Sequence, residues 1–468
     1  MSRKVSGKTR VVGSEEKAVS QRGSWSDKEK VPHGISETGN DERVWPITRL
    51  RYVAHLNPSV RDGLIRAVDT EVSFLPMEAI GEDGRINLER TRPVAEVRNG
   101  YSYFEDGDVA FAKVTPCFEN GKGALMRGLE RGAGFGTTEL TVLRPKLGTN
   151  PIFLNYVLQS SRFRQLGAAA MTGAGGLKRV PDEFTQDFET PWPTAEDQTR
   201  IANFLDEQTA RIDALIAEKE RLVESLGMAS YELLHAVVTK GLRNTPMAYS
   251  GVEWIGEMPK HWSAPYVKFV AKLESGHTPS RQHPEYWDNC TIPWFSLADV
   301  WQIRSGAVEI VTQTEEMVSE LGLQNSSARL LPAKTVMLSR TASVGFSAIM
   351  GVPMATTQDF VNWVCGPSVL PEYLLYVFRA MHPEFERLKY GSTHSTIYMP
   401  DVVKFKMPLP PLVEQADIVE AARARKQRLD ELKSVAIKAI ERLREYRSSL
   451  ISAAVTGQLD MDNYVMGG

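Results

Sequence analysis

Two short stretches of the sequence contain residue types that could hold a phosphate group. TGAGGLK, from Thr172 to Lys178, is rich in glycine and ends in lysine, and ENGKG, from Glu119 to Gly123, has a similar composition. A nucleotide-binding P-loop needs GxxxxGK followed by serine or threonine, because the main-chain N–H groups, the lysine and the hydroxyl act together on phosphate and magnesium. Neither stretch fits this spacing, so we interpret both as turns.

Other catalytic signatures do not occur in the sequence. Adenine methyltransferases carry Asn or Asp before Pro-Pro and an aromatic residue, whereas the Pro-Pro pair here, Pro410-Pro411, precedes Leu412. There is no HExxH zinc motif, and the three cysteines lie far apart without a CxxC pair. PDEF at Pro181 resembles a nuclease acid pair but has no ExK nearby. The sequence therefore predicts no catalytic residues and no metal site.

Two polar loops in each half of the chain offer hydrogen-bonding side chains instead. Such groups can donate to phosphates, while Arg or Lys suits guanine and Asn suits adenine. A single polar loop is more often only solvated by water. Two such loops in each half are stronger evidence and indicate contact with nucleic acid. The candidates are Lys113, Thr115, Asn120, Lys122, Thr172, Lys178 and Arg179 in the first half, and Ser339, Arg340, Thr341, Ser343, Ser392, Thr393, His394, Ser395 and Thr396 in the second.

The segments that must position these loops are repeated along the chain. PWPTAEDQTRIANFLDE from Pro191 recurs as PLPPLVEQADIVEAARA from Pro408, 217 residues later, so Gln198 aligns with Gln415 without a gap. The endings also match, as AVVTKGL and AAVTGQL, and a fainter match joins WPITRLRYVAHLN with WSAPYVKFVAKLE at the same displacement. The sequence therefore contains one design used twice.

Each repeated segment has the apolar spacing of a long helix. Steps of four and three residues run from Ile201 to Leu233 in the first copy and from Ile418 to Leu450 in the second. A helix from Thr194 to about Lys240 would span roughly 70 Å, which is too long to bury against one small domain. We therefore predict that the two helices pack antiparallel about a pseudo-twofold axis; two independent helical hairpins are the alternative.

The stretches before the helices predict mixed α/β domains, because short β-branched runs such as TVLRP and KFKMPLP are broken by Gly, Pro and Asp. The polar opening of the chain predicts a disordered arm. The alternative is that its basic residues contact an acidic partner. The predicted segments are the arm at 1–44, domains at 45–192 and 262–408, long helices at 193–242 and 409–459, a docking linker at 243–261 and a tail at 460–468.

Composition and charge narrow the class of protein. A chain of 468 residues with 42% hydrophobic residues is expected to fold into several domains. It has neither an apolar run long enough for a membrane span nor a signal peptide, so we expect a soluble cytoplasmic protein. The net charge of −3 is unusual for a nucleic-acid binder, although local basic surfaces are compatible with it because charges act over about a Debye length.

The order of these segments resembles the DNA-specificity subunit of type I restriction-modification systems. The resemblance rests on the PLPPLVEQADIV helix, the VTG or VTK ending, the GVEWIGEMPKHW linker and the repetition of the whole unit. SGHTPSRQHPEYWDNCTIPWFSLADV from Ser275 and FLPMEAIGEDGRI from Phe74 also resemble two recognition-domain subtypes. WPTAEDQ replaces the more usual PLPPLxEQ in the first copy, and the arm is longer than the fold needs.

The resemblance implies two target-recognition domains, each reading one half of a split, asymmetric site in double-stranded DNA. It also implies two adenine-N6 methyltransferase subunits docked on the helices and two ATP-driven restriction subunits, so that S-adenosylmethionine, ATP and Mg²⁺ are used by the partners. Alternatives are an architectural coiled-coil scaffold, a stand-alone enzyme and a specificity subunit of a related methylation-based defence system. Thr278 and Ser280 join the DNA-binding candidates, and the partner-binding candidates are Leu205, Ile212, Leu222, Leu429 and Leu443.

Overall fold

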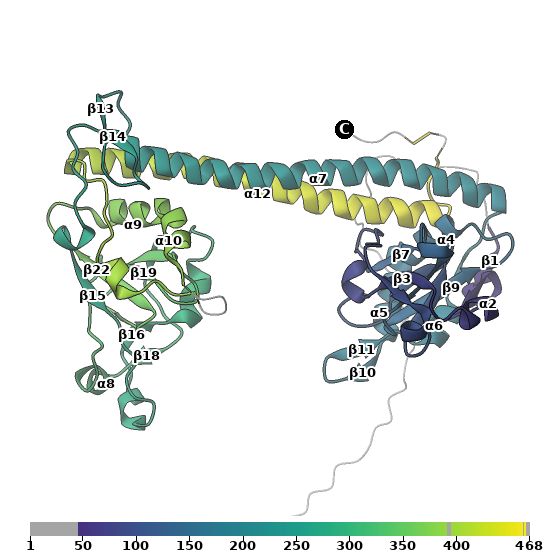
Figure 1. Cartoon of the computed structure of the whole chain (residues 1–468). Coiled ribbons are helices and arrows are strands. Elements are labelled where there is room, and N and C mark those ends of the chain that lie inside the picture. The colour runs from purple at the N-terminus through teal and green to yellow at the C-terminus, as the bar shows by residue number, and fades with distance from the viewer. Residues whose placement is uncertain (1–44, 391–394, 462, 465–468) are drawn as a thin grey trace, which may run out of the picture. The chain divides into compact units, whose positions relative to one another are not determined.

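The computed structural model describes residues 45–390, 395–461 and 463–464, so the predicted N-terminal arm lies outside the described residues. The chain forms two compact units. The first contains the described residues up to Arg211 together with those from Arg444 onward, and the second is Ile212–Leu443. Each unit contains an α/β domain and parts of both long helices (Figure 1).

Two four-stranded sheets form the domain of the first unit. One is antiparallel throughout, with the order β2 (Ala54–Leu56), β9 (Leu140–Pro145), β6 (Val109–Ala112), β7 (Gly123–Leu125). The other has the order β4 (Thr91–Pro93), β3 (Glu71–Leu75), β8 (Ala133–Gly136), β5 (Ser102–Glu105), in which β3 and β8 are parallel. The sequence of β6, VAFA, is buried at every position because this strand is central in its sheet.

The second unit repeats most of this topology, with an added edge strand in the larger sheet and three strands in the smaller one. Its larger sheet has the order β15 (Ala271–Ser275), β22 (Phe360–Cys365), β19 (Val336–Ser339), β20 (Ser347–Met350), β17 (Ile310–Val311), in which the added strand β17 is parallel to β20. Its smaller sheet has the order β18 (Met317–Val318), β16 (Ile292–Phe295), β21 (Ala355–Thr356). As in the first unit, one parallel pair, β16 with β21, lies beside an antiparallel pair, β16 with β18. The predicted internal repeat of two mixed α/β domains is therefore confirmed.

Shorter elements complete the two domains. Asn150 caps the first helix after β9 by accepting hydrogen bonds from the N–H groups of Ile152 and Phe153, and a proline occupies the first turn there and in the matching helix of the second unit. The first unit has α1 (Leu50–Val53), α2 (Asp62–Arg66), η1 (Met77–Ala79), α3 (Val94–Val97), η2 (Glu130–Gly132), α4 (Pro151–Gln159), α5 (Ser161–Ala170), α6 (Asp182–Asp187) and the strand pairs β1 (Ile47–Arg49) with β12 (Glu189–Pro191) and β10 (Thr172–Ala174) with β11 (Leu177–Arg179). The second has β13 (Met247–Tyr249) with β14 (Glu257–Pro259), η3 (Val267–Phe269), η4 (Pro284–Trp287), η5 (Leu297–Gln302), α8 (Glu320–Gln324), α9 (Pro371–Ala380), α10 (His382–Leu388) and α11 (Met399–Val402).

The repeated sequence segments form two long helices, α7 (Ala195–Lys240) and α12 (Leu412–Val455). In the second unit the end of α7 and the start of α12 share one core, since Val238 lies in the same buried cluster as Ile418 and Ala422. The two helices therefore run antiparallel there. In the same unit α9 lies between α12 and the larger sheet (Figure 1). The unbroken α7 rules out the alternative of separate helical hairpins.

Burial along α7 agrees with the predicted heptad at Ile201, Leu205, Gln208 and Ile212 and departs from it in part further along the helix. Ile212 and Ile216 are buried, whereas the predicted seam residues Leu215 and Leu222 are 39% and 43% exposed. A straight α-helix drifts by about 20° per heptad relative to a 3.5-residue repeat, so a seam drawn in steps of seven moves out to solvent. In α12 the predicted seam residues Ile418, Ala422, Ala436 and Leu450 are buried, whereas Leu432 is 50% exposed.

The repeated glutamines explain the start of each long helix. Gln198 Oε1 accepts a hydrogen bond from the main-chain N–H of Asn150 at 2.8 Å, and its Nε2 donates to the carbonyl of Pro193 at 3.0 Å. Gln415 bonds in the same way to the N–H of Leu370 and the carbonyl of Pro410. Both glutamines are buried, and each forms hydrogen bonds with main-chain groups at the start of its helix. Their repetition in the sequence is therefore structural.

The predicted linker at 243–261 contains the β13–β14 hairpin. This segment contributes Ile255 and Met258 to the core of the second unit. Trp262 follows it and packs over Gly241 at the end of α7. Among the helices of the described residues, none is long and apolar enough to cross a membrane.

Candidate nucleic-acid interface

The structure brings the two predicted loops of the first unit together. The segment after β6 pairs with the segment after β11, because Thr115 N–H donates to the Lys178 carbonyl at 3.0 Å and Val180 N–H donates to the Lys113 carbonyl at 2.8 Å. Lys113 N–H in turn donates to the carbonyl of Glu139, at 2.8 Å. Lys113, Thr115, Lys178 and Arg179 are therefore neighbours although they come from two distant parts of the sequence.

The second unit places its loops in the same way. Ile397 N–H donates to the Arg340 carbonyl, Ala342 N–H donates to the Ser395 carbonyl and Arg340 N–H donates to the Asp359 carbonyl, each at 2.8 Å. Arg340 thus takes the place of Lys113, and Asp359 that of Glu139. The main-chain frame is shared between the two units while the side chains on it differ. Ser392, Thr393 and His394 lie outside the described residues.

The first unit carries an exposed β-hairpin at this position. Strands β10 and β11 pair in register from Thr172 with Arg179 to Ala174 with Leu177. Gly175 and Gly176, with φ of +64° and +81°, form the two-residue connection, as a tight hairpin of this kind requires. The hairpin extends from the body of the domain as a separate ribbon (Figure 1). Thr172 and Lys178 are both exposed on it.

Arg179 is held by a carboxylate at the base of the hairpin. Its Nε and Nη2 donate to the two carboxylate oxygens of Glu139 at 2.8 and 2.6 Å. These hydrogen bonds are the main reason that the pKa of Glu139 is lowered, and they raise the pKa of Arg179. Glu139 was not among the predicted residues, and a partner 40 positions away in the chain leaves no local pattern in one sequence.

Arg340 of the second unit is held by main-chain carbonyls. Its Nε donates to the Gln358 carbonyl at 3.0 Å and its Nη1 to the Ile397 carbonyl at 3.4 Å. The guanidinium keeps further N–H donors, since arginine has five. Thr278 lies nearby, because its hydroxyl donates to Gln358 Oε1 at 2.7 Å. Arg340 and Thr278 therefore converge on one residue.

The remaining predicted residues divide by burial and contact. Ser339 is buried at the end of the central strand β19, so we exclude it from the interface. Thr341 and Ser343 are half-buried, and Ser280 is exposed. Asn120 and Lys122 contact the segment that follows β3, where Nδ2 of Asn120 donates to Glu82 and Nζ of Lys122 donates to the Met77 carbonyl.

The predicted partner-binding residues on the long helices are not equally accessible. Leu205 and Ile212 are buried by this chain itself, which removes them from any docking surface. Leu429 and Leu443 are half-buried. Leu222 is exposed, as are other apolar side chains on these helices that the heptad pattern did not single out, Met228, Val435 and Ile437.

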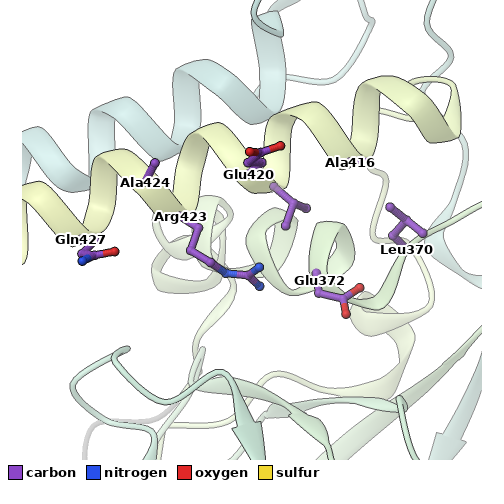
Figure 2. A pocket seen from close by; sticks show the side chains of 8 residues that line it. Leu370, Glu372, Ala416, Glu420, Arg423, Ala424 and Gln427 are labelled. Carbon is purple, nitrogen blue, oxygen red and sulfur yellow. The ribbon is translucent and has the colours of Figure 1, made fainter.

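A groove of about 560 Å³ lies in the second unit between α12 and the start of α9 (Figure 2). Glu420, Arg423 and Gln427 of α12 line it, opposite Leu370 and Glu372. Arg423 Nη2 donates to Glu309 Oε2 at 2.7 Å. None of the predicted DNA-binding residues lines this groove, so it is separate from the candidate interface.

Comparison with known proteins shows which proteins this chain resembles. Residues 259–442 match the model of the type I restriction modification DNA specificity domain. Over these residues the chain is similar to type I DNA specificity domains. The EcoEI specificity subunit of Escherichia coli is 40% identical over 162 residues, which are 34% of this chain and 26% of that protein. The matched stretch thus spans about a quarter of this relative, and the same holds for the EcoAI specificity subunit.

More remote relatives match over nearly the whole chain. The putative MjaX specificity subunit of Methanocaldococcus jannaschii is 20% identical over 440 residues, covering 91% of this chain and 96% of that protein. A chain solved in work on complex assembly and conformational transition of the type I R-M system superposes with a TM-score of 0.70 at 20% identity, over 89% of this chain and 99% of that one. The HsdS subunit from Thermoanaerobacter tengcongensis superposes with a TM-score of 0.52 at 19% identity, over 89% and 98%. These superpositions show a shared fold.

Proposed function

We propose that this chain is a specificity subunit that reads a bipartite, asymmetric site in double-stranded DNA and directs adenine-N6 methylation and restriction by partner subunits. The observation that carries the proposal is the shared main-chain frame with different side chains in the two units. Lys113 and Arg340 occupy matching positions in it, as do Arg179 and Thr396. Two readers built on one frame but carrying different donors fit a site whose halves differ in sequence.

The partners in this proposal are two methyltransferase subunits and two restriction subunits, and the complex works in the cytoplasm of a bacterium or archaeon. The chain itself holds no cofactor in the proposal, because S-adenosylmethionine, ATP and Mg²⁺ act on the partner subunits. The methyltransferases dock on α7 and α12, where Leu222 and Leu432 expose apolar surface in helices that otherwise carry charged side chains outward. A partner subunit docked on the helices would cover these apolar side chains.

Salt-dependent DNA binding by the assembled complex tests the proposal. Neutralising phosphates releases counterions, so the logarithm of the association constant should fall linearly as the logarithm of salt concentration rises. Anisotropy of a labelled duplex that carries the methylated motif, compared with a scrambled duplex, measures both slope and preference. An architectural scaffold would give no difference between the two duplexes, and that result would refute DNA reading by this subunit.

Activity of the purified chain provides a second, independent test. We expect no methyl transfer from S-adenosylmethionine to DNA by the lone subunit, and full transfer when the methyltransferase subunits are added. Transfer by the lone chain that persists through further purification would show that the chain is itself an enzyme.

A further inference from the structure

The ion pair between Glu139 and Arg179 lies at the base of the exposed β10–β11 hairpin, and its role in reading DNA rests on the proposed function. Three residues of each strand pair with one another, and every residue from Thr172 to Lys178 is exposed. The hairpin thus meets the domain at its base, through Thr115 and Arg179, while its side chains from Thr172 to Lys178 are exposed.

Glu139 is itself fixed before it holds Arg179. It lies between β8 and β9, and its N–H donates to the hydroxyl of Thr137 at 3.2 Å. Its carbonyl accepts the N–H of Lys113, the residue whose own carbonyl accepts the N–H of Val180 just after the hairpin. The carboxylate and the main chain of Glu139 therefore hold the two strands that meet at the hairpin base.

The fork between Glu139 and Arg179 fixes direction as well as position. Two parallel N–H···O bonds at 2.8 and 2.6 Å allow one orientation of the guanidinium plane, whereas a single bond would allow rotation. Because Arg179 pairs with Thr172 across the hairpin, this constraint acts at the base of both strands.

The dimensions and chemistry of the hairpin fit the major groove of B-form DNA. That groove admits a two-stranded β-ribbon and presents both guanine acceptors and thymine methyl groups. Next to the glycine tip the hairpin carries Leu177, 48% exposed, and Lys178. Because successive side chains of a strand point to opposite faces, Lys178 offers an ammonium on one face of the ribbon and Leu177 an apolar group on the other. The glycine pair lets the tip approach closely.

We propose that the β10–β11 hairpin enters the major groove, with Lys178 against base edges, and that Glu139 is the positioning residue that aims it. Arg179 is occupied by Glu139 and orients the ribbon. In the second unit Thr396, which has no guanidinium group, stands in the place of Arg179, and Asp359 Oδ2 accepts a hydrogen bond from the Thr357 hydroxyl. The effect of Glu139 is therefore confined to the half-site of the first unit.

Methylation by the assembled complex tests this proposal, with the methylated adenines of a host genome mapped by single-molecule sequencing. Glu139→Gln removes the charge and one acceptor of the fork at nearly constant volume. We expect discrimination at one or two positions of a single half-site to fall roughly tenfold, with the other half-site and the spacer unchanged. Lys178→Ala should relax the same half-site, and the exchange Glu139→Arg with Arg179→Glu should restore it in part.

Glu96→Gln is the matched control, because Glu96 forms an exposed ion pair with Arg92 at 3.0 Å elsewhere in the same unit. It should leave the motif unchanged. An unchanged motif in Glu139→Gln, or a uniform fall in methylation at every site without relaxation, would overturn the positioning role. Failure of the wild-type complex to methylate any defined motif would instead refute the proposed function, so the two failures are distinguishable.

Discussion

Gln415 joins the start of α12 to the start of α9 by accepting, at 2.9 Å, a hydrogen bond from the main-chain N–H of Leu370. Its Nε2 donates to the carbonyls of Ser368 and Pro410 at 2.9 and 2.8 Å, so three main-chain groups depend on one buried carboxamide. Gln198 does the same work at the start of α7. The glutamine that recurs in the sequence thus fixes how each long helix leaves its domain.

Replacing this carboxamide should destabilise the second unit. Gln415→Ala leaves the Leu370 N–H and the two carbonyls without a partner in a buried position, which costs about 1–3 kcal/mol of unfolding free energy. Urea denaturation followed by far-UV circular dichroism measures the change. Gln427→Ala is the matched control on the same helix, where the side chain is exposed and bonds Glu431. Equal stability of the two variants would show that the buried contact is unimportant.

The glycines that end the long helices should resist substitution. Gly241 and Gly457 have φ of +69° and +78°, and an added Cβ would lie 2.9 Å from the Trp262 ring and 3.1 Å from the Trp45 ring respectively. Alanine at either position should therefore cost about 1 kcal/mol or more. Gly227 lies within α7 with open space around it, and Gly227→Ala should stabilise the protein by about 0.5–1 kcal/mol. Thermal unfolding of the three variants should give opposite signs, and a loss of stability in Gly227→Ala would contradict the helix-propensity explanation.

The ion pair beside the groove predicts a dependence of stability on pH. Burial alone would raise the pKa of Glu309, but hydrogen bonds from Tyr376 and Arg423 offset it and lower the pKa overall. A lowered pKa in the folded state means that Glu309 contributes fully above its ordinary pKa of about 4.3 and loses that contribution as pH falls through the folded value.

Glu309→Gln should therefore be less stable than the wild type at pH 7, and the difference should shrink in acid. Guanidinium denaturation at pH 7 and at about pH 3 measures it, with the exposed Glu431→Gln as control. A difference that grows as pH falls would contradict the assigned sign.

Replacing exposed leucines of the long helices with glutamate should weaken partner binding without unfolding the protein. Leu222→Glu and Leu432→Glu place a carboxylate on surfaces that are 43% and 50% exposed, so stability should stay within about 0.5 kcal/mol of the wild type. Sedimentation with the methyltransferase subunit should show at least a tenfold loss of affinity. Val413→Glu, at the exposed start of α12, serves as control. Normal assembly of the Leu222 and Leu432 variants would place the docking surface elsewhere.

The sequence was sufficient for the architecture because its strongest signals are local or repeated. Apolar steps of four and three residues predicted α7 and α12, and the repeat predicted that the domains share one topology. The exact seam was missed, since a strict heptad and a straight helix diverge over many turns. Leu215 was expected to be covered for this reason, whereas the neighbouring Ile216 is buried.

The sequence predicted which segments form the polar loops of the candidate interface. It did not predict which contacts their side chains make. The Ser339 side chain was expected in a polar loop, yet it ends a central strand in which every residue is buried. The fork from Arg179 to Glu139 joins segments 40 residues apart, and pairing over such distances depends on the folded sheet. Whether a side chain contacts a neighbour or is exposed therefore depends on the fold. It cannot be predicted from the residue type alone.

Exchange of one domain tests the central claim that two units read two half-sites independently. Residues 262–408 would be replaced by the matching domain of a relative, and methylated adenines would be mapped in cells that carry the partner subunits. Because the shared frame presents a separate set of side chains in each unit, one half of the methylated motif should change while the other half and the spacer stay the same. A motif that changed in both halves would contradict independent reading.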